Sequence, residues 1–264
     1  MEISVGIRID PEEGISSFGI EKVNSLINFG SKVVSMEQGG AVMRRLPDKN
    51  EATVSMTLSG YDMKVIMEDI DLENSPQWQE YCRRYKEGSA LIKPYMHYDD
   101  VKSTPATESN GEIERGIELL KSSIEINEGG GSAYWLIGKA YQALKNDAEA
   151  LAAFKRAFEL ERENKDVARE YCLACLDAVE PKRALMAAGR AVTIAPDDAG
   201  LRSNLGLAYL LDAQLDHAEG VLVTATEMDP NDSIAKNLLR LVGQVKTGER
   251  AQPKCIADLQ KREG

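Results

Sequence analysis

The chain has 264 residues, of which 43% are hydrophobic and 28% are charged, a composition typical of a globular protein and not of a disordered one. Its formal net charge is −11, and acidic residues exceed basic ones in both halves. The sequence contains no basic stripe of the kind that follows a phosphate backbone, which argues against nucleic acid as a partner. No apolar run is long enough to span a bilayer and no signal peptide is visible, so we expect a cytoplasmic protein without a membrane segment.

Residues 1–72 are expected to form an α+β module with a mainly antiparallel sheet and the element order β-α-β-β-β-β. EISVGIRI (2–9) alternates apolar and polar residues, as a strand does. SSFGIEKVNSLINFG (16–30) carries apolar residues at helical spacing between a serine cap and a glycine stop.

Two hairpins are predicted to complete this module. KVVSM (32–36) and AVMRRL (41–46) flank a Gln-Gly-Gly turn, and ATVSMTL (52–58) and DMKVIME (62–68) flank a Ser-Gly-Tyr turn. The module contains no histidine, no cysteine and no phosphate-binding glycine loop, so we assign it no catalytic residue, cofactor or metal ligand. No family is identified for it.

Residues 73–110 are expected to hold one helix, around WQEYCRRY (78–85), and a long insert or linker. Beyond them a repeat dominates the sequence. YWLIGKAYQ (134–142) aligns with RSNLGLAYL (202–210) at a shift of 68, which is twice 34, and Cys172 and Cys175 lie halfway between the aligned glycine and tyrosine positions. Three alanines keep the same period downstream, at Ala150, Ala184 and Ala218.

This period and these markers resemble the tetratricopeptide repeat, whose signature is W-x2-L-G-x2-Y, then A-x3-F-x2-A, then P. The resemblance places three full repeats at 131–164, 165–198 and 199–232, within an all-α solenoid over 111–247 that ends in a cap helix. Residues 248–264 are expected to be a polar tail with one short helix after Pro253.

The C-x-x-C pair has three possible meanings: a redox pair, half of a zinc site, or core packing. Cys172 and Cys175 occupy the glycine and tyrosine positions of the middle repeat, and the two histidines, His97 and His217, are far from them in sequence. We therefore expect both cysteines to be buried as small hydrophobic residues, with no metal bound.

A divergent first repeat is expected upstream of the three full ones. Gly116, Leu120 and Ser123 fall one period before the markers of the next unit, and Cys82 falls on the glycine position of the helix before them. The alternative is an unrelated helix followed by a linker.

The resemblance implies a binding function, because first helices line the concave wall of such solenoids and take peptides or helices from partner proteins. Trp135 stands one place after the consensus aromatic, which directs it toward the groove, and the basic set that grips a terminal carboxylate in some family members is not matched. The expected groove residues are Trp135, Lys139, Gln142, Arg169, Leu173, Leu176, Ser203, Asn204, Leu207 and Leu210.

We expect this groove to be mostly apolar and to favour an amphipathic helix or an extended apolar segment. In the alternative arrangement the leucines are covered by the chain itself, through the insert at 89–110 or the α+β module. The leading function is accordingly a protein-interaction scaffold that is not an enzyme. The other candidate is a small-ligand sensor or enzyme in residues 1–72, with the repeats as a recruitment arm.

Overall fold

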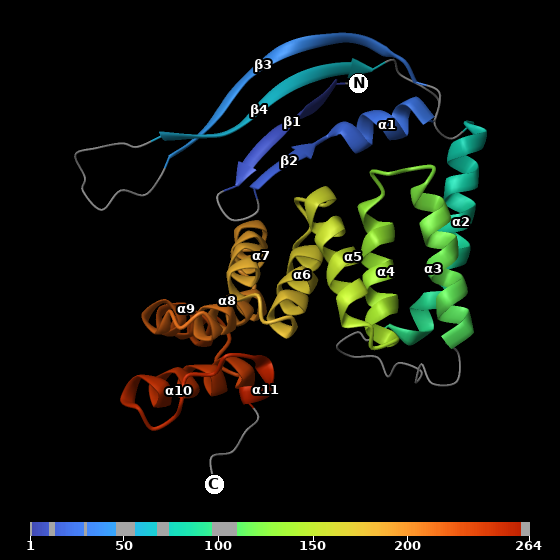
Figure 1. The fold of residues 1–264 in the computed structure, drawn as a ribbon. Helices are drawn as coiled ribbons and strands as arrows, with labels where there is room; N and C mark the ends of the chain where they lie inside the picture. Colours follow the sequence, from blue (N-terminus) through green and yellow to red (C-terminus); the bar gives the residue numbers. More distant parts are fainter. Residues whose placement is uncertain are drawn as a thin grey trace. The chain divides into compact units, whose positions relative to one another are not determined.

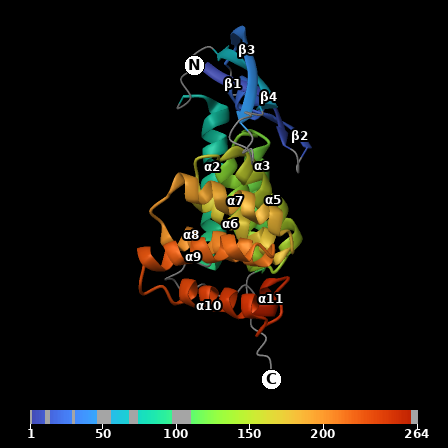
Figure 2. The same ribbon diagram turned by 90° about the vertical axis from the view of Figure 1, so that its left-hand side faces the viewer.

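A computed structural model describes residues 2–10, 14–28, 31–45, 56–67, 74–96 and 110–259 (Figures 1 and 2). The chain forms two compact units. Unit 1 comprises Met1–Pro94 and Gly111–Ala133, and unit 2 comprises Tyr95–Asn110 and Tyr134–Gly264. No helix in the described ranges is long and apolar enough to cross a membrane.

Unit 1 contains an antiparallel four-stranded sheet with the strand order β2-β1-β4-β3. The strands are β1 (Glu2–Asp10), β2 (Gly14–Phe18), β3 (Val33–Arg45) and β4 (Met56–Met67), and α1 (Ile20–Asn28) follows β2. The α+β class is thus confirmed, whereas the observed element order is β-β-α-β-β instead of β-α-β-β-β-β.

Each predicted hairpin is a single long strand. The Gln-Gly-Gly segment lies inside β3, where the register against β4 shifts between Gln38 and Ala41, so the glycines form an irregularity and not a turn. The Ser-Gly-Tyr segment lies inside β4, because pairing with β1 and β3 on both sides keeps it extended. Residues 46–55, between the two strands, lie outside the described residues.

The chain turns from β2 into α1 at Gly19, which has φ +78°. A Cβ atom at this position would collide with the carbonyl oxygen of Ser4 in β1, so the close approach requires glycine. The helix then packs Val23 and Leu26 against Ile3, Val5 and Val65 of the sheet. These residues form the small core of the module.

Three hydrogen bonds join α1 to the turn after α3 (Asn110–Ile124), all within unit 1. The backbone N–H of Gly129 donates to Ser25 Oγ (3.2 Å), Asn24 Nδ2 to Glu128 Oε2 (3.3 Å) and Asn28 Nδ2 to the Ile126 carbonyl (3.4 Å). The sheet module and the α3 helix therefore share one compact unit.

Helix α2 (Pro76–Ile92) crosses α3 at two glycines, and the short 3₁₀ helix η1 (Lys93–Tyr95) follows it. A Cβ atom on Gly88 would lie 2.9 Å from the Gly116 carbonyl oxygen and 3.0 Å from Leu120 Cγ. Gly88 thus contacts Leu120, as the glycines of the full repeats contact the equivalent side chains. The glycine position of this helix pair is Gly88 and not Cys82, because α2 runs further toward its C-terminus than the sequence pattern indicated.

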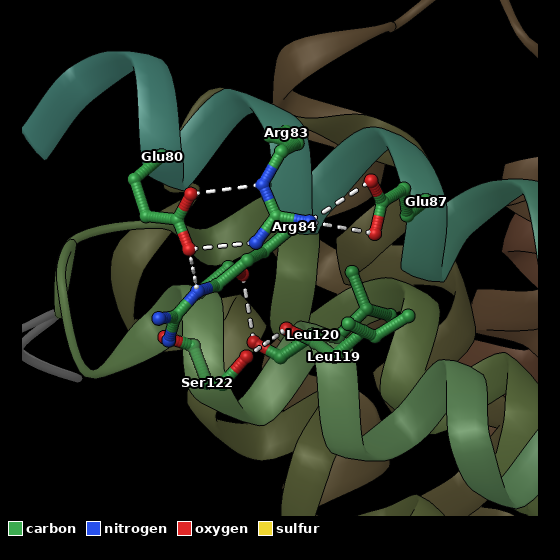
Figure 3. A network of polar contacts seen from close by, with 8 residues as sticks. Glu80, Arg83, Arg84, Glu87, Leu119, Leu120 and Ser122 are labelled. Atoms are coloured by element: carbon green, nitrogen blue, oxygen red, sulfur yellow. Dashed lines mark hydrogen bonds and ion pairs between the residues drawn. The ribbon is translucent and has the colours of Figure 1, made fainter. Parts of the chain in front are cut away.

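A charged network follows α2 and links it to α3 (Figure 3). Glu80 accepts hydrogen bonds from Arg83 (2.7 Å) and Arg84 (2.6 Å), which lower the pKa of the Glu80 carboxyl to about 2. Arg84 also donates to the Ser122 carbonyl of α3 (3.1 Å). These groups are partly exposed to solvent, which screens their charges, so the network orients the two helices more than it stabilises them.

The three full repeats are helix pairs, and a cap helix and a short final helix follow them. Their bounds are α4 (Gly131–Ala143), α5 (Asp147–Leu160), α6 (Lys165–Asp177), α7 (Pro181–Ile194), α8 (Ala199–Leu211), α9 (Leu215–Met228), α10 (Ser233–Thr247) and α11 (Ile256–Leu259).

Capping recurs with the period of the repeat. Asn164, Asp198 and Asp232 are 34 residues apart, and each accepts a backbone N–H bond at the start of α6, α8 or α10. The turns inside the pairs recur as well, with positive φ at Lys145, Val179 and Ala213.

The two helices of each repeat touch where a small residue faces a larger one. A Cβ atom on Gly138 would lie 2.5 Å from Phe154, and one on Gly206 would lie 2.5 Å from Leu222. In the middle repeat the equivalent positions hold Cys172 and Ala188, both fully buried. Here the larger residue of the two, Cys172, is on the first helix and the smaller, Ala188, is on the second, and the space between the helices is still filled.

Candidate functional site

A hollow of about 840 Å³ opens on the first helices of unit 2. Side chains of α4, α6 and α8 line it, together with the first residue of α5 and residues at the start of α10. Contributions from consecutive repeats make it an elongated site suited to a ligand that extends along the solenoid.

Six of the ten expected groove residues line this hollow: Lys139, Gln142, Arg169, Leu173, Ser203 and Asn204. The other four do not. Leu176 and Leu210 are buried in the core, and Trp135 and Leu207 are half-buried against core clusters. The Nε1 atom of Trp135 is buried and has no hydrogen-bond partner among the described residues.

Apolar atoms make up more of the exposed lining than polar atoms, in keeping with the mostly apolar groove expected from the sequence, but charged side chains are also numerous. Eight of its residues are charged: the acids Asp147, Asp166, Glu170, Asp198 and Asp232 and the bases Lys139, Lys165 and Arg169. The sequence pattern did not include the charged capping residues at the helix starts, and two of the leucines that it placed in the groove, Leu176 and Leu210, are buried.

A buried ion pair lies at this site between the first and second repeats. Lys139 Nζ of α4 is 3.2 Å from Glu170 Oε2 of α6, with the two side chains only 9% and 6% exposed. The other oxygen, Oε1, accepts a bond from Arg169 at 3.3 Å. Because a buried carboxylate needs several partners to offset its desolvation, these cations hold Glu170 in one position.

The edge of the hollow is formed by capping residues of the repeats. Asp198 caps α8 through the Leu201 N–H and also receives a bond from Lys165 Nζ at 2.9 Å. Partial burial alone would raise the pKa of Asp198, but these bonds keep it below its usual range. Asp232 caps α10 and accepts a bond from Ser203 at 3.1 Å.

Negative charge is in excess in this lining, with five acids against three bases, a balance of −2. Lys139, Lys165 and Arg169 each have a carboxylate partner within the lining. Asp147 lies near another acid, Asp177. Burial raises the pKa of Asp177, and the charge of the Asp147 carboxylate raises it further.

The C-x-x-C pair belongs to the core. Cys172 and Cys175 are fully buried and form no disulfide, and burial, reinforced by Cys175, raises the pKa of the Cys172 thiol to about 12. A protonated, enclosed thiol is neither a good nucleophile nor a metal ligand. Among the described residues, no three His, Cys, Asp or Glu side chains are grouped so that they could hold a metal ion.

The insert at 89–110, which in one expected arrangement covers the groove leucines, is described only in part. Ile92, Tyr95 and Met96 are buried, and residues 97–109 lie outside the described residues, as do 260–264 of the tail. In the tail, α11 is the short helix expected after Pro253.

Comparison with known proteins identifies the repeats. Residues 131–164, the first full repeat, match the family profile of the tetratricopeptide repeat. No curated protein sequence matches the chain.

Solved structures share the fold. A MamA crystal structure is similar at 16% identity and a TM-score of 0.53, over 64% of this chain and 84% of that one. MamA from residue 41 to its end, from Desulfovibrio magneticus RS-1, is similar at 19% identity and a TM-score of 0.52, over 64% and 86%. At such identities the likeness shows the fold alone. The C-terminal half of the chain is a solenoid of tetratricopeptide repeats.

Proposed function

We propose that this protein is an interaction scaffold that binds a peptide segment of a partner protein along its first helices. The observation that carries the proposal is the hollow of about 840 Å³, whose polar groups are held in place by contacts within the protein. Groups fixed before a ligand arrives lose little conformational freedom on binding, so their interactions contribute more fully to affinity.

The charge of the lining favours a peptide with lysine or arginine side chains. The ion pairs described for the cations of the site are with Glu170 and Asp198, which leaves Asp147, Asp166 and Asp232 to add to the negative charge of the lining. A basic peptide would meet this excess negative charge, and an acidic peptide would be repelled by it.

Peptide binding can be measured by fluorescence anisotropy with the full chain and two labelled twelve-residue probes. Both consist of glycine and serine, and they differ only in carrying four lysines or four glutamates. We expect the lysine probe to bind and the glutamate probe not to bind. Added salt should weaken the binding, since screening acts strongly on exposed charges.

Variants tie the binding to the hollow. Asp147→Asn and Asp232→Asn remove two negative charges, and asparagine retains the capping capacity of Asp232. Together the two substitutions should weaken the binding of the lysine probe by about tenfold. The matched control combines Glu118→Gln with Glu227→Gln and so neutralises two exposed acids outside the hollow, one in α3 and one in α9. Equal losses in the control and the site variants would show that only the net charge of the protein attracts the probe, and would reject the proposal.

A further inference from the structure

The segment that follows the cap helix folds back onto the repeats. Gly248, with φ +78°, ends α10, and we call residues 249–259 the C-terminal arm. Gln252 Nε2 donates to the carbonyl oxygen of Leu210 in α8 at 2.6 Å, and Pro253 is buried. The arm is thereby attached to the end of the first helix of the third repeat.

Two apolar side chains of α11 face the solenoid. Ile256 packs against the core cluster that contains Leu176, and Leu259 packs against this cluster and the cluster that contains Leu210. The two residues are three apart, a spacing that places both on one face of a helical turn. In other complexes, a short helix with such a face is a common way of filling an apolar groove.

The clusters under the arm include two of the four leucines that the repeat pattern assigned to an open groove. Leu176 and Leu210 are 1% and 0% exposed, and Leu207 packs against the same two clusters as Leu259. The lining of the hollow, in contrast, includes eight charged side chains. The first-helix surface therefore has a polar part that is open and an apolar part against which the chain's own arm is packed.

The arm is built as a compact folded element. Arg250 Nη2 donates to the carbonyl oxygens of Asp258 (2.8 Å) and Leu259 (3.0 Å), and the Lys254 N–H donates to the Asp258 carboxylate (3.0 Å). These bonds close within the arm and would persist if it moved away from the repeats as one piece.

We propose that the apolar surface beneath the arm is a second docking site, for a short helix with two apolar residues three apart, and that the arm occupies it as an internal ligand. A partner segment of this kind competes with the arm, so its apparent affinity is reduced by the fraction of time that the site is covered. This proposal does not depend on peptide binding in the hollow, because it concerns different side chains.

The test uses the full chain with Ile256→Ser and Leu259→Ser, and a labelled peptide of residues 249–260 carrying Cys255→Ser. The peptide should bind the variant at least about tenfold more tightly than it binds the unaltered protein, because the covering side chains have been weakened. The same peptide with serine at 256 and 259 should bind neither protein.

A control pair, Val223→Ser and Met228→Ser, removes two exposed apolar side chains of α9 and should leave peptide binding unchanged. Circular dichroism establishes that each variant is folded, and Leu259→Ala alone replaces the double variant if the latter is not. Failure of the peptide to bind a folded arm variant, or equal binding to the unaltered protein, would overturn the proposal. The lysine probe of the hollow should bind the arm variant and the unaltered protein alike, so failure of one proposal is separable from failure of the other.

Discussion

The middle repeat and its two neighbours build the same helix pair from different side chains. Repeats one and three place glycine on the first helix against Phe154 or Leu222 on the second, whereas the middle repeat has Cys172 and Ala188 at those positions. All three are closely packed. The comparison shows that the crossing can be filled in two ways, by a large side chain on the second helix against glycine or by a small side chain on each helix.

The contacts between repeats differ as well. The buried pair Lys139–Glu170 joins the first repeat to the second, but one period later the equivalent positions hold Leu173 and Asn204. The buried ion pair therefore joins the middle repeat to the first repeat, and no equivalent pair exists at these positions between the middle repeat and the third. Four substitutions test these differences, and they follow from the largest expected effect to the smallest.

Lys139→Met removes the cation of the buried pair and should lower the free energy of unfolding by about 3 kcal/mol, because Glu170 stays buried with fewer partners. The measurement is urea unfolding followed by circular dichroism. Lys165→Met is the control: it removes a partner of Asp198 that is 43% exposed, and it should cost less than about 1 kcal/mol. Similar losses for both would mean that the interface does not depend on the buried pair.

Gly206→Ala should destabilise the protein by about 2 kcal/mol, because the new methyl group would lie 2.5 Å from Leu222 Cγ and must displace a fully buried side chain. Gly220→Ala, where a Cβ atom meets nothing within 4 Å, should instead be neutral or slightly stabilising. A neutral result for Gly206→Ala in urea unfolding would show that the crossing tolerates added volume and would remove the basis of the comparison.

Ala188→Leu should cost about 2 kcal/mol alone, because Cys172 already fills the crossing. Combined with Cys172→Gly, it recreates the Gly206–Leu222 arrangement and should recover at least about 1 kcal/mol relative to the sum of the two single changes. A double-mutant cycle in urea measures this coupling. Strict additivity would contradict the idea that the two positions share one volume.

Val179→Gly should stabilise the protein by about 1 kcal/mol, because valine with φ +61° is strained in the left-handed region. The equivalent residues of the other repeats, Lys145 and Ala213, have the same conformation without a β-branched side chain. Ala213→Gly should therefore give a smaller gain. A loss of stability for Val179→Gly in the same urea assay would place the strain elsewhere.

The amino-acid sequence alone determined the repeats. Each helix contacts mainly its neighbours in sequence, so a 34-residue period fixes the helix pairs, the closing glycines at Gly138 and Gly206, and the burial of Cys172 and Cys175. Six of the ten groove residues follow from the same register, because position within a repeat decides which side of a first helix a residue lies on.

Only the tertiary structure decided the rest. Whether Gly39 and Gly40 make a turn or an irregularity within β3 depends on pairing with β4, a strand distant in sequence. Gly88 replaces Cys82 at the α2–α3 crossing because the contact is with a helix that begins at Asn110. Leu176 and Leu210, two of the leucines assigned to an open groove, lie in clusters against which the C-terminal arm packs. No periodic pattern records this contact, because the arm belongs to no repeat.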